Sequence, residues 1–293
     1  MFEMIAHNIP DQQIFIKDVS VTLRRLDLVH PQISGNKFFK LKYNFLEAQR
    51  QGYQHILSFG GAYSNHIAAT AFAAQHFGFK SVGIIRGEEL AGRPLNPTLA
   101  TAQKFGMQLH FVSREQYRRK HEADYLLELG QKFPRPFVIP EGGTNALAIQ
   151  GCQEILKEDD TQFDVICCAA GTGGTITGLI EASQAHQQVL GFSALKGSFL
   201  KDEVARLTSK TNWNILDDYC CGGYAKTSLE LMQFIQEFES RFSIPLEQVY
   251  TAKMLMGILD LIEKNYFPTG SRLLVIHSGG LQGRNVPFAP IQA

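Results

Sequence analysis

The sequence has few features that would mark a nucleic-acid-binding, secreted or membrane protein. Its 293 residues balance 28 Lys and Arg against 28 Asp and Glu, so no positive excess favours nucleic acid or an anionic membrane surface as a partner. Only five cysteines occur, an odd number without C-x-x-C spacing, which argues against a disulfide framework and a zinc site. No apolar run approaches the roughly 20 residues that a membrane helix needs. We therefore expect no metal, no nucleic acid and no membrane among its partners.

The N-terminus also lacks an export signal. Met1-Phe2-Glu3-Met4 has neither the basic nor the apolar region of a secretory signal peptide. Together with thiols that we expect to be reduced, this predicts a cytoplasmic protein. The apolar fraction of 44% is that of an ordinary globular protein, and the length suits one large α/β domain or two modest ones.

Short apolar runs alternate with amphipathic stretches along the chain. The apolar runs predict strands at residues 55–59, 80–85, 108–112, 137–139, 163–169, 189–192 and 272–277. The amphipathic stretches predict helices at residues 38–50, 65–77, 98–105, 115–129, 146–156, 175–185, 229–242 and 253–264. The basic run Arg118-Arg119-Lys120 is interpreted as a solvated helix face. This alternation predicts an α/β fold with mostly parallel sheets and helices on both faces.

Glycine-rich turns recur where the predicted strands end, which is where parallel sheets bind ligands. The clearest anion site is the loop Gly171, Thr172, Gly173, Gly174 and Thr175, before a predicted helix. Successive backbone N–H groups at a helix start can hold a phosphate. The loop fails the dinucleotide pattern because Ile176 replaces the third glycine, and it fails the P-loop pattern because Leu179 stands in place of lysine. A smaller phosphorylated cofactor remains.

A lysine stands at the start of the first predicted helix. Lys37 follows Asn36 in the first turn, where the positive end of the helix dipole favours the neutral amine. A neutral amine can attack a carbonyl carbon. Lys40 lies one turn further along the same face and could contact a phosphate.

Seven motifs occur in an order that resembles one enzyme family. They are Ser34-Gly35-Asn36-Lys37-x-x-Lys40, Gly60-Gly61-x-x-Ser64-Asn65-His66, Gly142-Gly143-Thr144-Asn145, the loop 171–175, Gly223-Tyr224, Tyr250-Thr251-x-Lys253 and His277-Ser278-Gly279-Gly280. Spanning nearly the whole chain, they resemble the 1-aminocyclopropane-1-carboxylate deaminase/D-cysteine desulfhydrase family of pyridoxal-phosphate enzymes. The resemblance implies the tryptophan synthase β-like fold (fold type II), with two domains and twisted, mostly parallel sheets. We expect residues 1–46 and 144–293 to form a large cofactor-binding domain and residues 47–143 a small domain.

The resemblance also implies a role for each matching residue. Lys37 would bind pyridoxal phosphate covalently and later transfer a proton, and Lys40 and the loop 171–175 would hold the phosphate. Asn65 would bond the cofactor's phenolic oxygen, and Ser278 would face its pyridine nitrogen. Ser64, Asn65 and His66 would bind the substrate carboxylate, and Ser64 would also lie near the reacting atoms. Tyr224 and Tyr250 would lie beside the cofactor and the substrate. Thr251 would contact the substrate.

Two positions distinguish members of this family. The pair Tyr250-Thr251 resembles the desulfhydrase, whereas the deaminase has Tyr-Glu. Ser278 supplies a hydroxyl, as the desulfhydrase does with threonine, whereas the deaminase has leucine. A hydroxyl is a weak proton source and leaves the pyridine nitrogen unprotonated, which suits β-elimination better than opening a cyclopropane. Glu141, Ile67 and the pair Cys220-Cys221 depart from the desulfhydrase pattern, so they leave the substrate open.

We therefore expect a lyase that acts on a small amino acid and converts D-cysteine to pyruvate, sulfide and ammonia. The alternatives are 1-aminocyclopropane-1-carboxylate deamination to 2-oxobutyrate and ammonia, and a non-enzymatic cofactor- or nucleotide-binding protein. A serine hydrolase is disfavoured because G-x-S-x-G is absent and Ser64 and His66 do not face each other two residues apart on a helix. Relatives are commonly homodimers, and we expect the same here.

Overall fold

The computed structural model describes residues 1–284, which fold into two compact units. The four-stranded unit comprises residues 1–6, 30–33 and 37–151. The six-stranded unit comprises residues 7–29 and 34–36 together with the described chain from residue 152 onward. The domain division expected from the sequence, with residues 47–143 as the small domain, stays a prediction.

The four-stranded unit contains a wholly parallel sheet in the order β5-β4-β3-β6. Its strands are β3 (His55–Gly60), β4 (Lys80–Arg86), β5 (Met107–Val112) and β6 (Pro136–Ile139). The helices are α1 (Asn36–Arg50, from its second residue), α2 (Asn65–His76), α3 (Pro97–Lys104), α4 (Arg114–Arg118), α5 (Ala123–Lys132) and α6 (Ala146–Gln153, to residue 151). Alternate strand residues bury on opposite faces: Leu57 and Phe59 pack with α4 and α5, whereas Ile85 and Met107 pack with α2 and α3.

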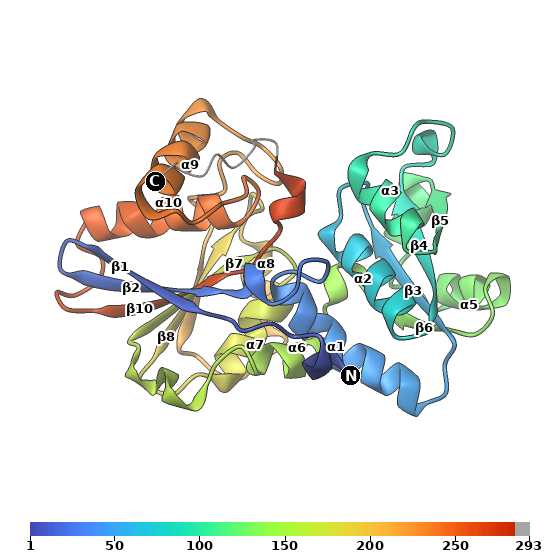
Figure 1. Cartoon of the computed structure of the whole chain (residues 1–293), viewed down its shortest axis with the longest axis horizontal. Coiled ribbons are helices and arrows are strands. Elements are labelled where there is room, and N and C mark those ends of the chain that lie inside the picture. Colours follow the sequence, from blue (N-terminus) through green and yellow to red (C-terminus); the bar gives the residue numbers. More distant parts are fainter. Residues whose placement is uncertain (285–293) are drawn as a thin grey trace. The chain divides into compact units, whose positions relative to one another are not determined.

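The six-stranded unit contains a mixed sheet in the order β1-β2-β10-β7-β8-β9, in which only the β1–β2 pair is antiparallel among the described strands. Its strands are β1 (Asp11–Ile16), β2 (Val19–Arg25), β7 (Val165–Ala170), β8 (Gln188–Ser193), β9 (Trp213–Leu216) and β10 (Arg272–His277). Its helices are α7 (Gly174–Ala182), α8 (Phe199–Ala205), α9 (Leu229–Phe242) and α10 (Thr251–Glu263). Figure 1 shows α9 and α10 on one side of this sheet and α7 on the other. The predicted α/β fold with mostly parallel sheets and helices on both faces is therefore confirmed.

A buried ion cluster fixes the end of β2 in the six-stranded unit. Arg24 is 1% exposed, and its guanidinium donates to Asp11 at 2.9 and 2.6 Å and to the carbonyl of Ile155 at 2.9 Å. It also donates to the carboxylate of Asp160 at 2.9 Å. These bonds satisfy a buried charge that would otherwise cost several kcal/mol.

The structure corrects two expectations about the segment after β5. The single helix predicted over residues 115–129 is two helices, α4 and α5, and the break allows Tyr117 and Tyr125 to bury in the same core. The run Arg118-Arg119-Lys120 is not one solvated helix face. Arg118 is exposed, but Arg119 pairs with Glu122 at 2.9 Å, and Lys120 pairs with Glu141 at 3.4 Å.

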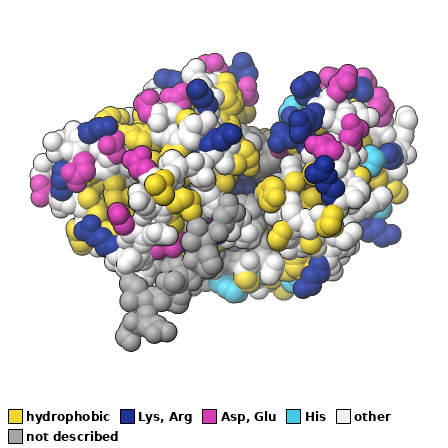
Figure 2. All heavy atoms as spheres, turned by 90° about the horizontal axis from the view of Figure 1, so that it is seen from above, with side chains coloured by type: hydrophobic (Ala, Val, Ile, Leu, Met, Phe, Trp, Pro, Cys, Tyr) yellow, Lys and Arg dark blue, Asp and Glu magenta, His cyan; other side chains and the backbone are white. Residues whose placement is uncertain are grey.

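The surface carries interspersed charges of both signs. On the face seen in Figure 2, Lys and Arg side chains lie among Asp and Glu side chains, as the equal totals of 28 and 28 predict. Within residues 1–284, no helix combines the length and apolar character that a bilayer crossing requires.

Candidate active site

The glycine-rich loop lies where the sequence places it, between β7 and α7 in the six-stranded unit. Gly173 adopts φ +80°, a left-handed conformation that allows the chain to turn into α7 at Gly174. The first N–H groups of α7 have no partner within the helix and carry its positive dipole end. A Cβ on Gly171 would approach Cε1 of Tyr250 to 3.1 Å, so the tyrosine ring lies directly against the loop. The loop has the chemistry of a phosphate site with an aromatic wall.

Asn36 connects this loop to the end of β10. Its side-chain Nδ2 donates to Oγ1 of Thr175 at 2.8 Å, and its backbone N–H donates to the carbonyl of Ser278 at 3.2 Å. Gly35 has φ +72°, and a Cβ there would lie 1.8 Å from the Ser278 carbonyl oxygen, so only glycine fits. Lys37 is the next residue in the chain. Its backbone is therefore tied at its N-terminal side to the glycine loop and to the residue predicted to face a pyridine nitrogen.

A buried cluster surrounds His277, the residue before Ser278. His277 donates through Nε2–H to the carbonyl of Pro245 at 2.7 Å, and its Nδ1 lies 3.2 Å from the carboxylate of Asp27. Asp27 accepts two hydrogen bonds from Arg25 at 2.8 and 2.6 Å. Burial lowers the pKa of His277 despite the nearby carboxylate. Beyond the motif His277-Ser278, local spacing does not reveal this cluster, because Arg25 and Asp27 lie about 250 residues away in the chain.

Tyr224 and Tyr250 are neighbours in the same unit. Their rings make an edge-to-face contact with centroids 6.1 Å apart. Tyr250 precedes α10, whose first N–H groups bond the carboxylate of Glu247: Tyr250 at 2.7 Å and Thr251 at 2.6 Å. The hydroxyl of Thr251 is buried and bonds the backbone of Glu247. Sequence reasoning missed Glu247, which fixes the start of α10 as a capping residue does.

The loop that carries Tyr224 is held by Lys253 from α10. Lys253 is 2% exposed, and its Nζ donates to the carbonyls of Cys220 and Gly223, both at 2.8 Å. Burial lowers the pKa of Lys253. In the motif Tyr250-Thr251-x-Lys253, the lysine thus contacts the loop that carries Tyr224 and lies one helical turn after Tyr250.

In the four-stranded unit, Ser64, Asn65 and His66 begin α2 as predicted. Ser64 is the N-cap, and its Oγ accepts from the N–H of Ile67 at 3.3 Å. The buried Oδ1 of Asn65 has no hydrogen-bond partner among the described residues. An unpartnered buried acceptor is costly unless a further group satisfies it.

His66 offers a second such acceptor. Its Nε2 lies 2.8 Å from Oγ of Ser58, and that hydroxyl donates its only proton to the carbonyl of Ile139 at 2.8 Å. His66 must therefore carry its proton on Nε2, which leaves the buried, unpartnered Nδ1 as an acceptor. Burial, followed by the charges of Lys37 and Lys40, lowers the pKa of His66 well below its usual value. The ring is neutral and lies close enough to both lysines to feel their charges.

Lys40 is buried at 3% exposure. Its Nζ donates to the carbonyl of Gly142 at 2.9 Å and to Oγ1 of Thr144 at 3.1 Å. It therefore also braces the glycine turn after β6. Lys37 is half-buried.

These residues fit a cofactor with a phosphate, a carbonyl carbon and an aromatic ring. The six-stranded unit, taken by itself, has a glycine cradle with an aromatic wall. The four-stranded unit, taken by itself, has Lys37 and unpartnered buried acceptors on Asn65 and His66. Over residues 1–284, no group of three or more His, Cys, Asp and Glu side chains is arranged to hold a metal ion.

Comparison with known proteins identifies the class. Residues 17–279 match the family of pyridoxal-phosphate-dependent enzymes, and the chain belongs to this family. Its members use pyridoxal phosphate, so the predicted cofactor and the expectation of an enzyme are confirmed. This assignment favours an enzyme over the non-enzymatic alternative.

Within the family, the relatives agree with the resemblance drawn from the motifs. A Thermotoga maritima protein named putative 1-aminocyclopropane-1-carboxylate deaminase is 32% identical over 90% of this chain and 89% of its own length. An Arabidopsis thaliana protein named bifunctional D-cysteine desulfhydrase/1-aminocyclopropane-1-carboxylate deaminase is 29% identical over 89% of this chain and 72% of its own. A solved structure described as the ACC deaminase homologue has a TM-score of 0.83 at 27% identity, covering 95% of this chain and 91% of that one.

Proposed function

We propose that this enzyme is a carbon–sulfur lyase that converts D-cysteine and water to pyruvate, sulfide and ammonia. The observation that carries the proposal is the double attachment of Asn36, whose side chain bonds Thr175 at 2.8 Å while its N–H bonds the carbonyl of Ser278 at 3.2 Å. Lys37 follows this anchor directly in the chain, which supports a role for its amine in holding a group whose phosphate is bound by the loop. When bound, pyridoxal phosphate supplies an electron sink for negative charge at the substrate α-carbon.

The residue roles implied by the resemblance are part of this proposal. Lys37 would hold the cofactor through Nζ, and its amine would take the α-proton of the substrate. Lys40 and the loop 171–175 bind the phosphate, and Asn65 bonds the phenolic oxygen. The N–H groups of Ser64, Asn65 and His66 at the start of α2 bind the substrate carboxylate, with Ser64 also near the reacting atoms. The Nδ1 of the neutral His66 is available to accept a hydrogen bond from an N–H or O–H group of a bound molecule. Because the ring is neutral, it adds no positive charge next to the substrate carboxylate.

The choice of D-cysteine as substrate rests on Ser278 and Thr251. The hydroxyl of Ser278 is a weak acid and leaves a pyridine nitrogen unprotonated, which weakens the electron sink. A weaker sink suffices when the β-substituent leaves with the electron pair, as sulfide does. Thr251, proposed for the substrate side, brings no charge, and Tyr224 and Tyr250 flank the cofactor and substrate.

A product assay tests the proposal. Purified enzyme saturated with pyridoxal phosphate is incubated with D-cysteine, L-cysteine and 1-aminocyclopropane-1-carboxylate, and sulfide, pyruvate and 2-oxobutyrate are measured. We expect equal amounts of sulfide and pyruvate from D-cysteine, and none from a Lys37→Ala variant. Failure to release sulfide from D-cysteine would overturn the substrate assignment.

A second candidate is 1-aminocyclopropane-1-carboxylate deamination, which the printed name of the Thermotoga maritima relative favours. In the same assay, 2-oxobutyrate formed faster than pyruvate would make it the correct function. We also propose that the enzyme acts as a homodimer in the reducing cytoplasm. The five free thiols, four of them buried, suit that compartment.

A further inference from the structure

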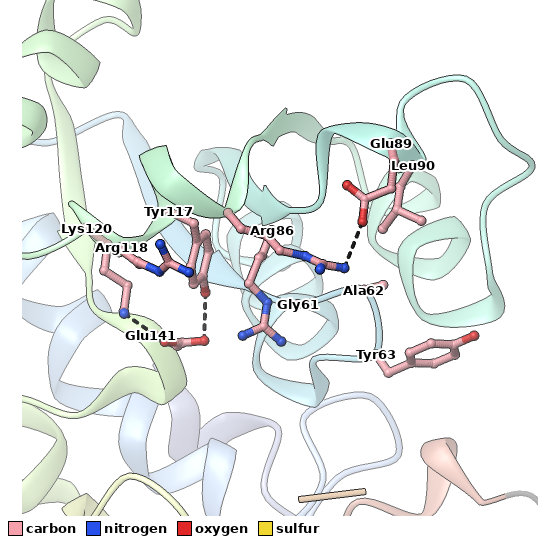
Figure 3. A pocket seen from close by; sticks show the side chains of 11 residues that line it. Gly61, Ala62, Tyr63, Arg86, Glu89, Leu90, Tyr117, Arg118, Lys120 and Glu141 are labelled. Carbon is pink, nitrogen blue, oxygen red and sulfur yellow. Dashed lines mark hydrogen bonds and ion pairs between the residues drawn. The ribbon is translucent and has the colours of Figure 1, made fainter.

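A pocket of about 550 Å³ lies within the four-stranded unit and has no role in the site described above. It sits at the edge where the four parallel strands end, and Figure 3 shows the side chains that line it. Gly61 follows β3, Arg86 ends β4, the α4 segment follows β5, and Glu141 follows β6. Ligands of open parallel sheets bind at this edge, at the point where the strand order reverses. Here the chain proceeds from β3 to β4 and β5 and then returns to place β6 on the other side of β3.

The side chains that line the pocket carry more positive than negative charge. Four cationic side chains line it together with two carboxylates: Arg86, Arg114, Arg118, Lys120, Glu89 and Glu141. Both carboxylates are already paired, Glu89 with Arg114 at 3.1 Å and Glu141 with Lys120 at 3.4 Å. Glu141 also accepts from the hydroxyl of Tyr117 at 2.7 Å. Two guanidinium groups, those of Arg86 and Arg118, then have neither a hydrogen bond nor an ion pair to any residue that the structure describes.

The Arg86 guanidinium is held in position by uncharged groups. It stacks over the ring of Tyr117, with 5.7 Å between the guanidinium carbon and the ring centroid. It also lies beside Gly61, where a Cβ would be 3.5 Å from Nη2 (Figure 3). Tyr117 is itself fixed by burial at 3% exposure. A guanidinium group held in this way keeps its N–H donors available for a carboxylate or phosphate.

We propose that this pocket binds an oxyanion, a carboxylate or phosphate group of a small molecule, through Arg86 and Arg118. The anion is either an acidic group on the side chain of a further amino-acid substrate, a group that D-cysteine does not have, or a separate small molecule. The loop Gly61-Ala62-Tyr63 lines the pocket and leads directly into Ser64, the N-cap of α2. If the anion is part of the substrate, the proposal rests on the proposed lyase function. If the anion is a separate small molecule, the proposal does not depend on that function.

Calorimetric titration of the pyridoxal-phosphate-saturated enzyme with inorganic phosphate tests the site. We expect saturable binding that weakens about tenfold in Arg86→Gln and in Arg118→Gln, because each removes charge-assisted hydrogen bonds. Arg93→Gln is the matched control, since Arg93 is an exposed arginine of the same unit that does not line the pocket. Melting temperatures confirm that the variants are folded. Absence of saturable binding, or equal affinity in wild type and both pocket variants, overturns the proposal.

A kinetic ratio identifies the source of the anion. The ratio of kcat/KM for O-phospho-D-serine to that for D-cysteine is compared between wild type and Arg86→Gln. A tenfold fall in the ratio assigns the pocket to the substrate's acidic group, and an unchanged ratio together with weakened phosphate binding assigns it to a separate anion. If no amino acid is turned over, the proposed function fails while the titration still decides whether the pocket binds an anion.

Discussion

The bond between Asn36 and Thr175 is expected to control cofactor affinity. Replacing Asn36 by alanine removes the donor at 2.8 Å and leaves the buried hydroxyl of Thr175 without it, while the backbone bond to Ser278 remains possible. Loss of one partner from a buried hydrogen bond costs about 1 to 2 kcal/mol. Because Thr175 belongs to the loop proposed to bind the phosphate, we expect the Kd for pyridoxal phosphate to rise about 5- to 30-fold.

The assay is a titration of cofactor-free enzyme with pyridoxal phosphate, followed by its visible absorbance. Asn214→Ala on the edge strand β9 is the matched control, because Asn214 is half-buried in the same unit and lies outside the glycine loop. Its affinity should equal that of wild type.

A double-mutant cycle with Thr175→Val checks the cause. If the bond is responsible, the double variant binds the cofactor about as weakly as Thr175→Val alone, because Asn36→Ala then has no bond left to remove. Unchanged affinity in Asn36→Ala, or strictly additive effects in the double variant, would refute the reasoning.

Three further predictions follow from the structure. Arg24→Leu strands the buried carboxylate of Asp160, so urea unfolding should give a free energy lower by about 3 to 5 kcal/mol, and a loss below 1 kcal/mol would contradict the ion cluster's role. Burial lowers the pKa of His66 and of His277 in the folded state, so as the pH falls these histidines bind protons in the unfolded state before they do in the folded state. Their contribution to stability should be complete above pH 6.5. Below that pH, the free energy of unfolding should fall by up to about 1.4 kcal/mol per pH unit for each histidine. His66→Gln should flatten this dependence in denaturant melts between pH 5 and 7, and an equal slope would show that His66 is not the source. Lys253→Met frees the carbonyls of Cys220 and Gly223, so kcat/KM should fall by about tenfold with little change in cofactor Kd; the opposite pattern would place Lys253 in cofactor binding instead.

The elements with strong local patterns were predictable from the sequence. The strand predicted at residues 272–277 is β10 (Arg272–His277) and the helix predicted at residues 229–242 is α9 (Leu229–Phe242), both with the predicted bounds. A buried parallel strand is a continuous apolar run, and α9 has a regular amphipathic spacing.

The strands β2 and β9 escaped prediction. β2 ends in Arg24-Arg25, and the burial of Arg24 depends on carboxylates from Asp11 and Asp160, one of them 136 residues away. β9 is an edge strand whose four residues are all only half-buried. In β2 the alternation of the buried residues Val19, Val21 and Leu23 is a hydrophobic period that the sequence does contain, whereas β9 has none.

The motifs indicated which residues to suspect but not what holds them. The partners that fix the site are distant in sequence: Asn36 bonds Thr175 across 139 residues, and Lys253 bonds the carbonyl of Cys220 across 33. Glu247 is an ordinary acidic residue in sequence and becomes a cap only because the turn before α10 directs three N–H groups at its carboxylate. Such contacts depend on tertiary structure, which local spacing does not encode.

The attachment of the cofactor to Lys37 is the central claim, and one measurement tests it most directly. The pyridoxal-phosphate-loaded enzyme is reduced with borohydride, digested and examined by peptide mass spectrometry. We predict a pyridoxyl group on the peptide that contains Lys37 and on no other lysine peptide. A pyridoxyl group found on Lys40, Lys253 or another lysine, with Lys37 unmodified, would contradict it.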